Sequence, residues 1–111
     1  MSTQSIRRMA NVNGEITPLE AARISILDRG FLYGDSVYEV FRTYSGVPLF
    51  CHEHFERMEN SARLIAMTIS QSRDEMLDHM RQTAAKANVP KGAEIYVRWH
   101  VTRGTGALDL V

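Results

Sequence analysis

In the segment AEIYVRWHVTRG, residues 93–104, apolar and polar side chains alternate strictly from Ala93 to Thr102. Successive side chains of a β-strand point to opposite faces of its sheet, so this alternation predicts a strand with one covered face and one open face. The face expected to be covered carries only apolar side chains: Ile95, Val97, Trp99 and Val101. The opposite face carries polar ones: Tyr96, Arg98, His100 and Thr102. The remainder of the chain must therefore supply elements that pack on the apolar face.

Further strands are predicted in the first half of the chain. Asn13-Gly14, between short apolar flanks, is typical of a two-residue hairpin turn. Residues 23–27 and 37–44 are strand-like, and the second run is rich in β-branched and aromatic residues. The polar residues 28–36 between them are interpreted as a loop, and Ser45-Gly46 predicts a turn into a further short strand.

The hydrophobic period then changes from that of a strand to that of a helix. Apolar residues recur at helical spacing over residues 52–67, at Phe55, Met58, Ala62 and Ile65. A second helix is predicted after Ser72, because Glu75 follows three residues later and completes a capping box. The sum is an α+β domain, with antiparallel strands and two helices on one side.

Length, charge and cysteine content narrow the class of protein. A chain of 111 residues is the size of one domain, which we place at residues 1–111. A net charge of zero gives no support for a nucleic-acid or membrane surface. The single cysteine, Cys51, excludes an internal disulfide, and the N-terminal residues lack the apolar core of a signal peptide. We expect a cytoplasmic protein.

Common catalytic and metal-binding signatures are missing from the sequence. There is no GxGxxG loop, no phosphate-binding loop ending in Lys-Ser and no nucleophile elbow. Residues 51–54, CHEH, bring Cys51, His52 and His54 close together, but no second Cys/His pair supplies the remaining ligands of a tetrahedral site. We therefore expect no metal site.

Two features have both a functional and a purely structural interpretation. The polar face of the last strand, with Tyr96, Arg98 and His100, is either a binding surface or the solvated side of a half-exposed sheet. Arg57, flanked by acidic residues, is either a functional residue or a member of ordinary ion pairs on a helix surface.

Three segments, in this order and spacing, favour the functional interpretation. They are DRGFLYGDSVYEVFRTYSG (28–46), HFERMENSARL (54–64) and YVRWHVTRG (96–104), and together they resemble the N-terminal domain of class IV aminotransferases. That family is the fold-type IV group of pyridoxal-phosphate enzymes, which includes branched-chain and D-amino-acid aminotransferases and aminodeoxychorismate lyase. The resemblance implies the N-terminal half of a longer two-domain enzyme. That enzyme would be a homodimer that uses pyridoxal 5'-phosphate and moves an amino group between an amino acid (or amine) and a 2-oxo acid.

The resemblance also implies roles for individual residues. Arg57 matches the family arginine that clamps the cofactor phosphate, a role suited to a planar, permanently charged group. Tyr33 and Tyr38 match residues of the wall that faces the substrate. Tyr96 and Arg98 match the Tyr-x-Arg of the branched-chain enzymes, where this strand helps to hold the substrate carboxylate.

The chain departs from the family pattern in two places. The segment VTRG, with Arg103, is similar to the same segment of the D-amino-acid and (R)-amine members, so Arg103 is an alternative ligand for the substrate carboxylate. In the D-amino-acid enzymes an Arg and a His follow this segment. Here they are replaced by GALDL, with Leu108 and Leu110. Chirality of the substrate therefore stays open. Lys86 and Lys91 match nothing catalytic, so the Schiff-base lysine is expected in a second domain beyond this chain, and the fragment is expected to be inactive alone.

Two alternatives remain beside an aminotransferase. The first is an aminodeoxychorismate lyase-type enzyme, which shares the cofactor and the scaffold. The second is a non-catalytic binding or dimerisation module that lacks the catalytic half.

Overall fold

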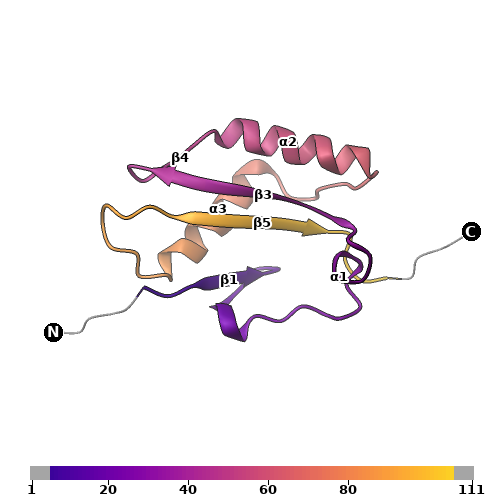
Figure 1. Cartoon of the computed structure of the whole chain (residues 1–111), viewed down its shortest axis with the longest axis horizontal. Helices are drawn as coiled ribbons and strands as arrows, with labels where there is room; N and C mark the ends of the chain where they lie inside the picture. Colours follow the sequence, from indigo (N-terminus) through magenta and orange to yellow (C-terminus); the bar gives the residue numbers. More distant parts are fainter. Residues whose placement is uncertain (1–5, 107–111) are drawn as a thin grey trace, which may run out of the picture.

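The computed structural model of the chain describes residues 6–106. Short strands and one long strand come first, two long helices follow, and a long strand comes last (Figure 1). In chain order the elements are β1 (Met9–Val12), β2 (Glu15–Pro18), a 3₁₀ turn (Leu19–Ala21), α1 (Arg29–Tyr33), β3 (Ser36–Tyr44), β4 (Val47–Pro48), α2 (Cys51–Leu64), α3 (Arg73–Ala85) and β5 (Tyr96–Thr102).

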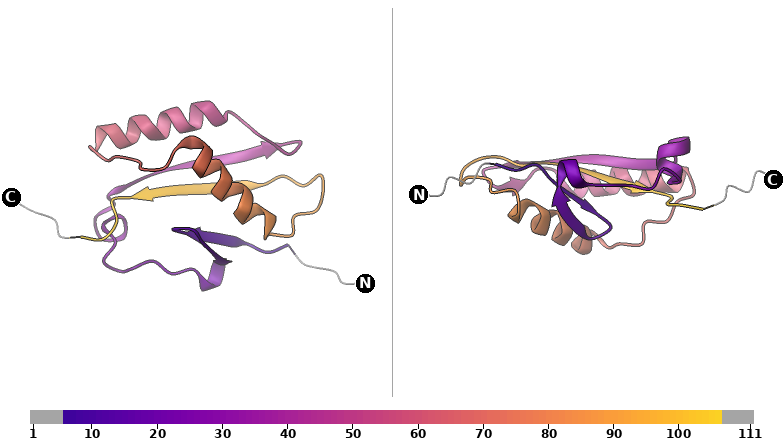
Figure 2. Two further views of the ribbon diagram at one scale, coloured as in Figure 1. Left: turned by 180° about the vertical axis from the view of Figure 1, so that it is seen from behind. Right: turned by 90° about the horizontal axis from the view of Figure 1, so that it is seen from below.

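The centre of the domain is an antiparallel sheet in the order β4-β3-β5. Strands β3 and β5 pair along their whole length, with Tyr38 opposite His100 and Val40 opposite Arg98. Helix α2 runs alongside β3, and α3 crosses over the sheet in the view from behind (Figure 2). Strands β1 and β2 form a separate hairpin, which contacts α3. The α+β architecture expected from the sequence is confirmed.

One face of the sheet packs on both long helices and forms the core. Its buried side chains come from β3, α2, α3 and the loop between the helices: Val37, Phe41, Phe55, Met58, Ala62, Met67, Met76 and Met80. The apolar residues of β5 pack against this cluster, whereas Tyr96, Arg98 and His100 are exposed on the opposite face. The alternation in residues 93–104 was therefore a correct guide to the two faces of the sheet, because side-chain direction in a strand is a local property.

The predicted turns and helix cap are also present. Asn13 and Gly14 both have positive φ, at 54° and 95°, as do Ser45 and Gly46, at 50° and 78°. Positive φ at both central residues is the geometry that two-residue hairpins require. Ser72 and Glu75 form the capping box at the start of α3, with the Ser72 hydroxyl accepting a hydrogen bond from the Glu75 amide at 3.1 Å.

Three local predictions were wrong. Residues 23–27 form no strand, since the amide of Leu27 bonds the Ser25 hydroxyl and the segment turns, leaving Ile26 73% exposed. Residues 28–36 are not a plain loop, because they contain α1. The helix predicted to reach residue 67 ends at Leu64. In each case local hydrogen bonds at a turn or cap set the boundary, which hydrophobic spacing does not report.

None of the helices within residues 6–106 is long and apolar enough to cross a bilayer. Over the same range, no group of His, Cys, Asp and Glu side chains is placed to hold a metal ion.

Candidate active site

The open face of the sheet carries a compact group of three side chains, Tyr38, Arg98 and His100, here called the open-face cluster. The Arg98 guanidinium carbon lies 4.4 Å from the centre of the Tyr38 ring. The His100 ring stacks on Tyr38 with centroids 5.3 Å apart and an angle of 22° between the planes. The Arg98 Nε–H donates a hydrogen bond to His100 Nε2 at 2.7 Å. Pairing of β3 with β5 therefore places a cation on an aromatic platform.

Arg98 is free to bind an anion. Among the residues that the structure describes it forms no ion pair, and its hydrogen bond to His100 uses only Nε. Partial burial of the exposed His100 ring lowers its pKa, and the neighbouring Arg98 cation lowers the pKa further. A neutral His100 keeps Nε2 as an acceptor near neutral pH.

A second polar group lies on the opposite, helix-covered side of the sheet. Glu39 stands between Val37 and Phe41 on β3 and is only 6% exposed. Arg57 of α2 donates to it from Nε at 2.8 Å and from Nη2 at 2.6 Å, and His54 Nδ1 lies 2.7 Å from the same carboxylate. The paired contact follows the shape of a guanidinium fork on a carboxylate.

Arg57 has further donor capacity after this pairing. Its side chain is 68% exposed, and within residues 6–106 its Nη1 group makes no hydrogen bond. Glu39 therefore orients the guanidinium and leaves one edge of it available to an anion.

The Glu39 pair makes stability depend on pH. The hydrogen bond from Arg57 holds the pKa of the Glu39 carboxyl below its ordinary value of 4.5, and His54 acts in the same direction while burial opposes them. Because the folded pKa is depressed, this stabilisation is present above about pH 4.5 and is lost as pH falls through the folded pKa. In urea titrations at several pH values, Glu39→Gln should flatten the decline in unfolding free energy below pH 4.5. A decline as steep as that of the unaltered chain would contradict this role for Glu39.

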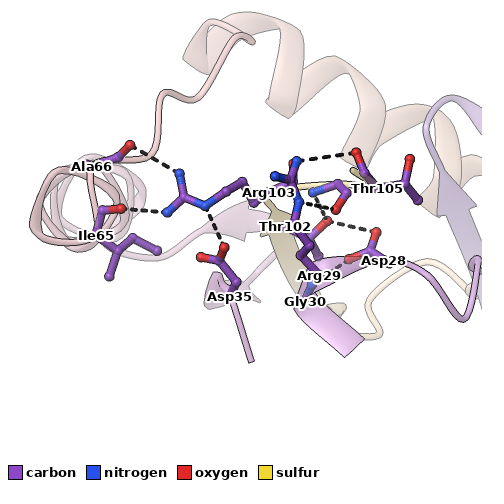
Figure 3. Close-up of polar contacts among 10 residues, drawn as sticks. Asp28, Arg29, Gly30, Asp35, Ile65, Ala66, Thr102, Arg103 and Thr105 are labelled. Carbon is purple, nitrogen blue, oxygen red and sulfur yellow. Dashed lines mark hydrogen bonds and ion pairs between the residues drawn. The ribbon is translucent and has the colours of Figure 1, made fainter. Parts of the chain in front are cut away.

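The segment before β3 is attached to the end of β5 by a set of polar contacts (Figure 3). The Arg29 side chain donates to the carbonyl oxygens of Gly104 at 2.9 Å and of Arg103 at 2.7 Å. Asp28 caps α1 through the Gly30 amide at 2.7 Å and accepts from the Thr102 hydroxyl at 3.0 Å. These contacts explain why residues 28–36 are so polar although they lie beside a core strand, since their polar side chains fix this segment to the end of β5.

Arg103 belongs to the same set of contacts. Its Nε pairs with Asp35 at 2.5 Å, and its Nη groups donate to the carbonyl oxygens of Ile65 at 2.6 Å and Ala66 at 3.2 Å (Figure 3). Strand β5 ends at Thr102, so the alternation of faces does not extend to Arg103. All three of its nitrogens are occupied in joining β5, the start of β3 and the end of α2.

Gly30 allows α1 to lie against β5, and its replacement tests this packing. A Cβ at position 30 would lie 2.6 Å from Thr102 Cγ2 and 2.8 Å from Thr102 Cβ. Gly30→Ala is therefore expected to lower the unfolding free energy by about 1–3 kcal/mol, measured by urea denaturation. Thr102→Ser removes the nearest atom, so the double variant should lose less than the sum of the single variants. Additive losses would contradict a direct clash.

The structure brings together some of the predicted site residues and separates others. Tyr38 and Arg98 are in contact, and the exposed Tyr96 lies on the same face of β5. Tyr33 is exposed at the end of α1, and Arg57 is on α2 beside Glu39. Residues 107–111, which include Leu108 and Leu110 of the GALDL departure, lie outside the described residues.

Sequence reasoning missed Glu39 and His54 as partners of Arg57. One signal for Glu39 was present, because it is a charged residue that shares its strand face with two apolar residues, Val37 and Phe41. A charge at such a position is buried and needs a partner. No comparable local signal pointed to His54.

Known proteins share the sequence pattern and the fold of this chain. A model of the family "Amino-transferase class IV" matches residues 36–110. The D-alanine aminotransferase of Staphylococcus epidermidis is 37% identical over 93 residues, which cover 84% of this chain and 32% of that protein. The D-alanine aminotransferase of Listeria monocytogenes is also 37% identical over 93 residues, covering 84% of this chain and 31% of that protein.

Solved structures show the same fold. The branched-chain amino acid aminotransferase from Escherichia coli superposes with a TM-score of 0.71 at 30% identity, over 83% of this chain and 32% of that chain. A second branched-chain amino acid aminotransferase, solved with pyridoxamine 5'-phosphate, gives a TM-score of 0.76 at 27% identity, over 96% of this chain and 36% of that chain. This chain thus spans about a third of the length of these relatives. Since the matched residues 36–110 include β3, both long helices and β5, the chain belongs to the class IV aminotransferase family and has the fold of that family's N-terminal domain.

Proposed function

We propose that the complete protein is a pyridoxal-phosphate-dependent aminotransferase that moves an amino group between an amino acid (or amine) and a 2-oxo acid. Residues 1–111 would be its N-terminal domain, which contributes the substrate wall and one phosphate ligand. The proposal rests mainly on the position of Arg98, which lies over Tyr38 on the open face and has no ion-pair partner among the described residues. Family membership and the names of the relatives support it.

Arg57 is the proposed ligand of the cofactor phosphate. When bound, pyridoxal phosphate supplies an aldehyde that accepts the amino group and a ring that withdraws electrons from the reacting carbon. The residues present fit such a group, because Glu39 fixes Nε and Nη2 of Arg57 and leaves Nη1 to donate to a phosphate oxygen. The lysine that holds the aldehyde is proposed to lie in the remainder of the protein.

The open face is the proposed substrate wall. Arg98, assisted by the Tyr96 phenol, would bind the substrate carboxylate, while Tyr33 and Tyr38 would line the pocket for the rest of the substrate. Arg103 is the weaker candidate for the carboxylate, since each of its three nitrogens already donates to Asp35 or to a carbonyl oxygen.

We also propose that the complete protein is a homodimer. Large apolar side chains are exposed along one continuous segment, which a partner would cover: Leu19, Ile24, Ile26, Leu27, Phe31 and Leu32. Sedimentation equilibrium of the full-length protein should give twice the chain mass, and a monomer at micromolar concentration would contradict the proposal.

The reaction is tested on the full-length protein loaded with pyridoxal phosphate. L- and D-amino acids are incubated one at a time with a 2-oxo acid acceptor, and both products are measured by chromatography. A transaminase converts donor and acceptor in equal amounts and needs the acceptor. Release of pyruvate from aminodeoxychorismate without an acceptor would identify a lyase instead. Failure to bind pyridoxal phosphate would favour the non-catalytic binding or dimerisation module.

Arg57→Ala is expected to weaken retention of pyridoxal phosphate by the full-length protein about tenfold or more, because a charge-assisted contact to the phosphate is lost. Equilibrium dialysis with absorbance detection measures the affinity. Arg63→Ala is the matched control, since Arg63 lies on the same helix and bonds only its neighbour Asn60 among the described residues. Equal affinity in the two variants would remove Arg57 from the phosphate site.

A further inference from the structure

An exposed arginine on a strand has many rotamers, and ordering it on a ligand costs conformational entropy. Arg98 is exposed on the open face, yet two neighbours restrain it. Tyr38 supports the guanidinium from one side at 4.4 Å, and His100 Nε2 accepts its Nε–H at 2.7 Å. The side chain is therefore partly ordered before any ligand arrives.

The sheet register produces this restraint. Tyr38 and His100 are direct partners across β3 and β5, and Arg98 is the next residue of β5 on the same face. The stacked Tyr38 and His100 rings, 5.3 Å apart, hold the imidazole where its Nε2 meets Arg98.

The direction of the hydrogen bond determines which donors remain. A guanidinium can meet a carboxylate through Nε and one Nη, or end-on through both Nη groups. Because His100 occupies Nε, the end-on pair of Nη groups is left, and within residues 6–106 neither of them is bonded.

We propose that His100 is a positioning residue for carboxylate recognition: it holds Nε of Arg98 and directs both Nη groups to the substrate carboxylate. The inference rests on the proposed function, in which Arg98 is the carboxylate ligand. It requires a neutral imidazole with Nε2 as the acceptor. Burial and the Arg98 cation both favour that state by lowering the pKa of His100. Within the described part of the chain, Arg98 from β5 and Tyr38 from β3 are the ionisable groups in contact with it.

Two variants of His100 separate acceptance of the hydrogen bond from simple bulk. In His100→Gln the side-chain carbonyl can still accept from Nε, whereas His100→Leu has similar bulk and no acceptor. The probe is 4-methylvaleric acid, a carboxylate without an amino group, titrated by calorimetry into the full-length protein loaded with pyridoxal phosphate. The neutral 4-methylvaleramide is the control ligand.

His100→Leu is expected to weaken binding of 4-methylvaleric acid about tenfold and to change the affinity for 4-methylvaleramide by less than about twofold. His100→Gln should keep most of the affinity for the acid. Arg98→Ala provides the reference. If Arg98→Ala weakens binding of 4-methylvaleric acid and His100→Leu does not, the positioning role of His100 is wrong although the proposed function stands. If Arg98→Ala itself has no effect, the carboxylate assignment fails and the inference fails with it. Equal losses for acid and amide in His100→Leu would show a general structural role and overturn the inference.

Discussion

Replacing Arg98 with alanine in the full-length protein is expected to raise the KM for carboxylate-bearing amino donors by about 10-fold to 100-fold. Hydrogen bonds to charged groups contribute about 1.5–3 kcal/mol, and a paired contact of guanidinium with carboxylate lies at the upper end. The KM for 1-phenylethylamine, which has no carboxylate, should change by less than about threefold. The ratio of the two effects, measured by steady-state kinetics, isolates recognition of the carboxylate.

The matched control is Arg81→Ala, which removes an exposed arginine from α3, on the other side of the sheet from Arg98. Both substrates should keep their kinetic constants in this variant. If Arg98→Ala raised the KM for the acid and the amine equally, Arg98 would be a structural residue of the open-face cluster. The proposed carboxylate site would then have to lie elsewhere.

Phe55→Ala is expected to have the largest effect on stability, a loss of about 3–5 kcal/mol in unfolding free energy. Phe55 is 1% exposed, and its ring lies 5.0 Å from that of Phe41 and beneath the guanidinium of Arg73, whose carbon is 5.7 Å from the ring centre. The substitution leaves a cavity between β3 and α2, which the surrounding close-packed core fills only in part. Since a domain of this size has an unfolding free energy of about 5–15 kcal/mol, this loss would be a large fraction of its total stability.

Loss of Phe55 would also disturb the proposed phosphate ligand Arg57, because Phe55 packs between β3, which carries Glu39, and α2, which carries Arg57. Urea denaturation followed by circular dichroism measures the loss. Phe50→Ala is the control, as Phe50 is 69% exposed before α2 and should change the unfolding free energy by less than about 0.5 kcal/mol. Similar losses in the two variants would contradict the place of Phe55 in the core.

The elements with local signals were predictable from the sequence. Alternation in residues 93–104 identified β5 and its two faces, Asn13-Gly14 identified a hairpin, and Ser72 with Glu75 identified the start of α3. These features depend on side-chain direction, turn dihedral angles and a cap within one turn of helix, all of which involve residues close in the chain. By the same alternation Arg98 and His100 had to share a face.

Contacts between distant parts of the chain were decided only by the tertiary structure. The partner of Arg57 is Glu39, 18 positions away, and Arg103 is bound to Asp35, 68 positions away. Residues 23–27 have the composition of a strand but form none, because the chain turns at Ser25 and no strand of the described residues pairs with this segment. The sequence alone thus determined the two long helices, the hairpin turns and the strand faces. The register of β3 on β5 decided that Tyr38 would support Arg98, since pairing of strands is a property of the folded sheet.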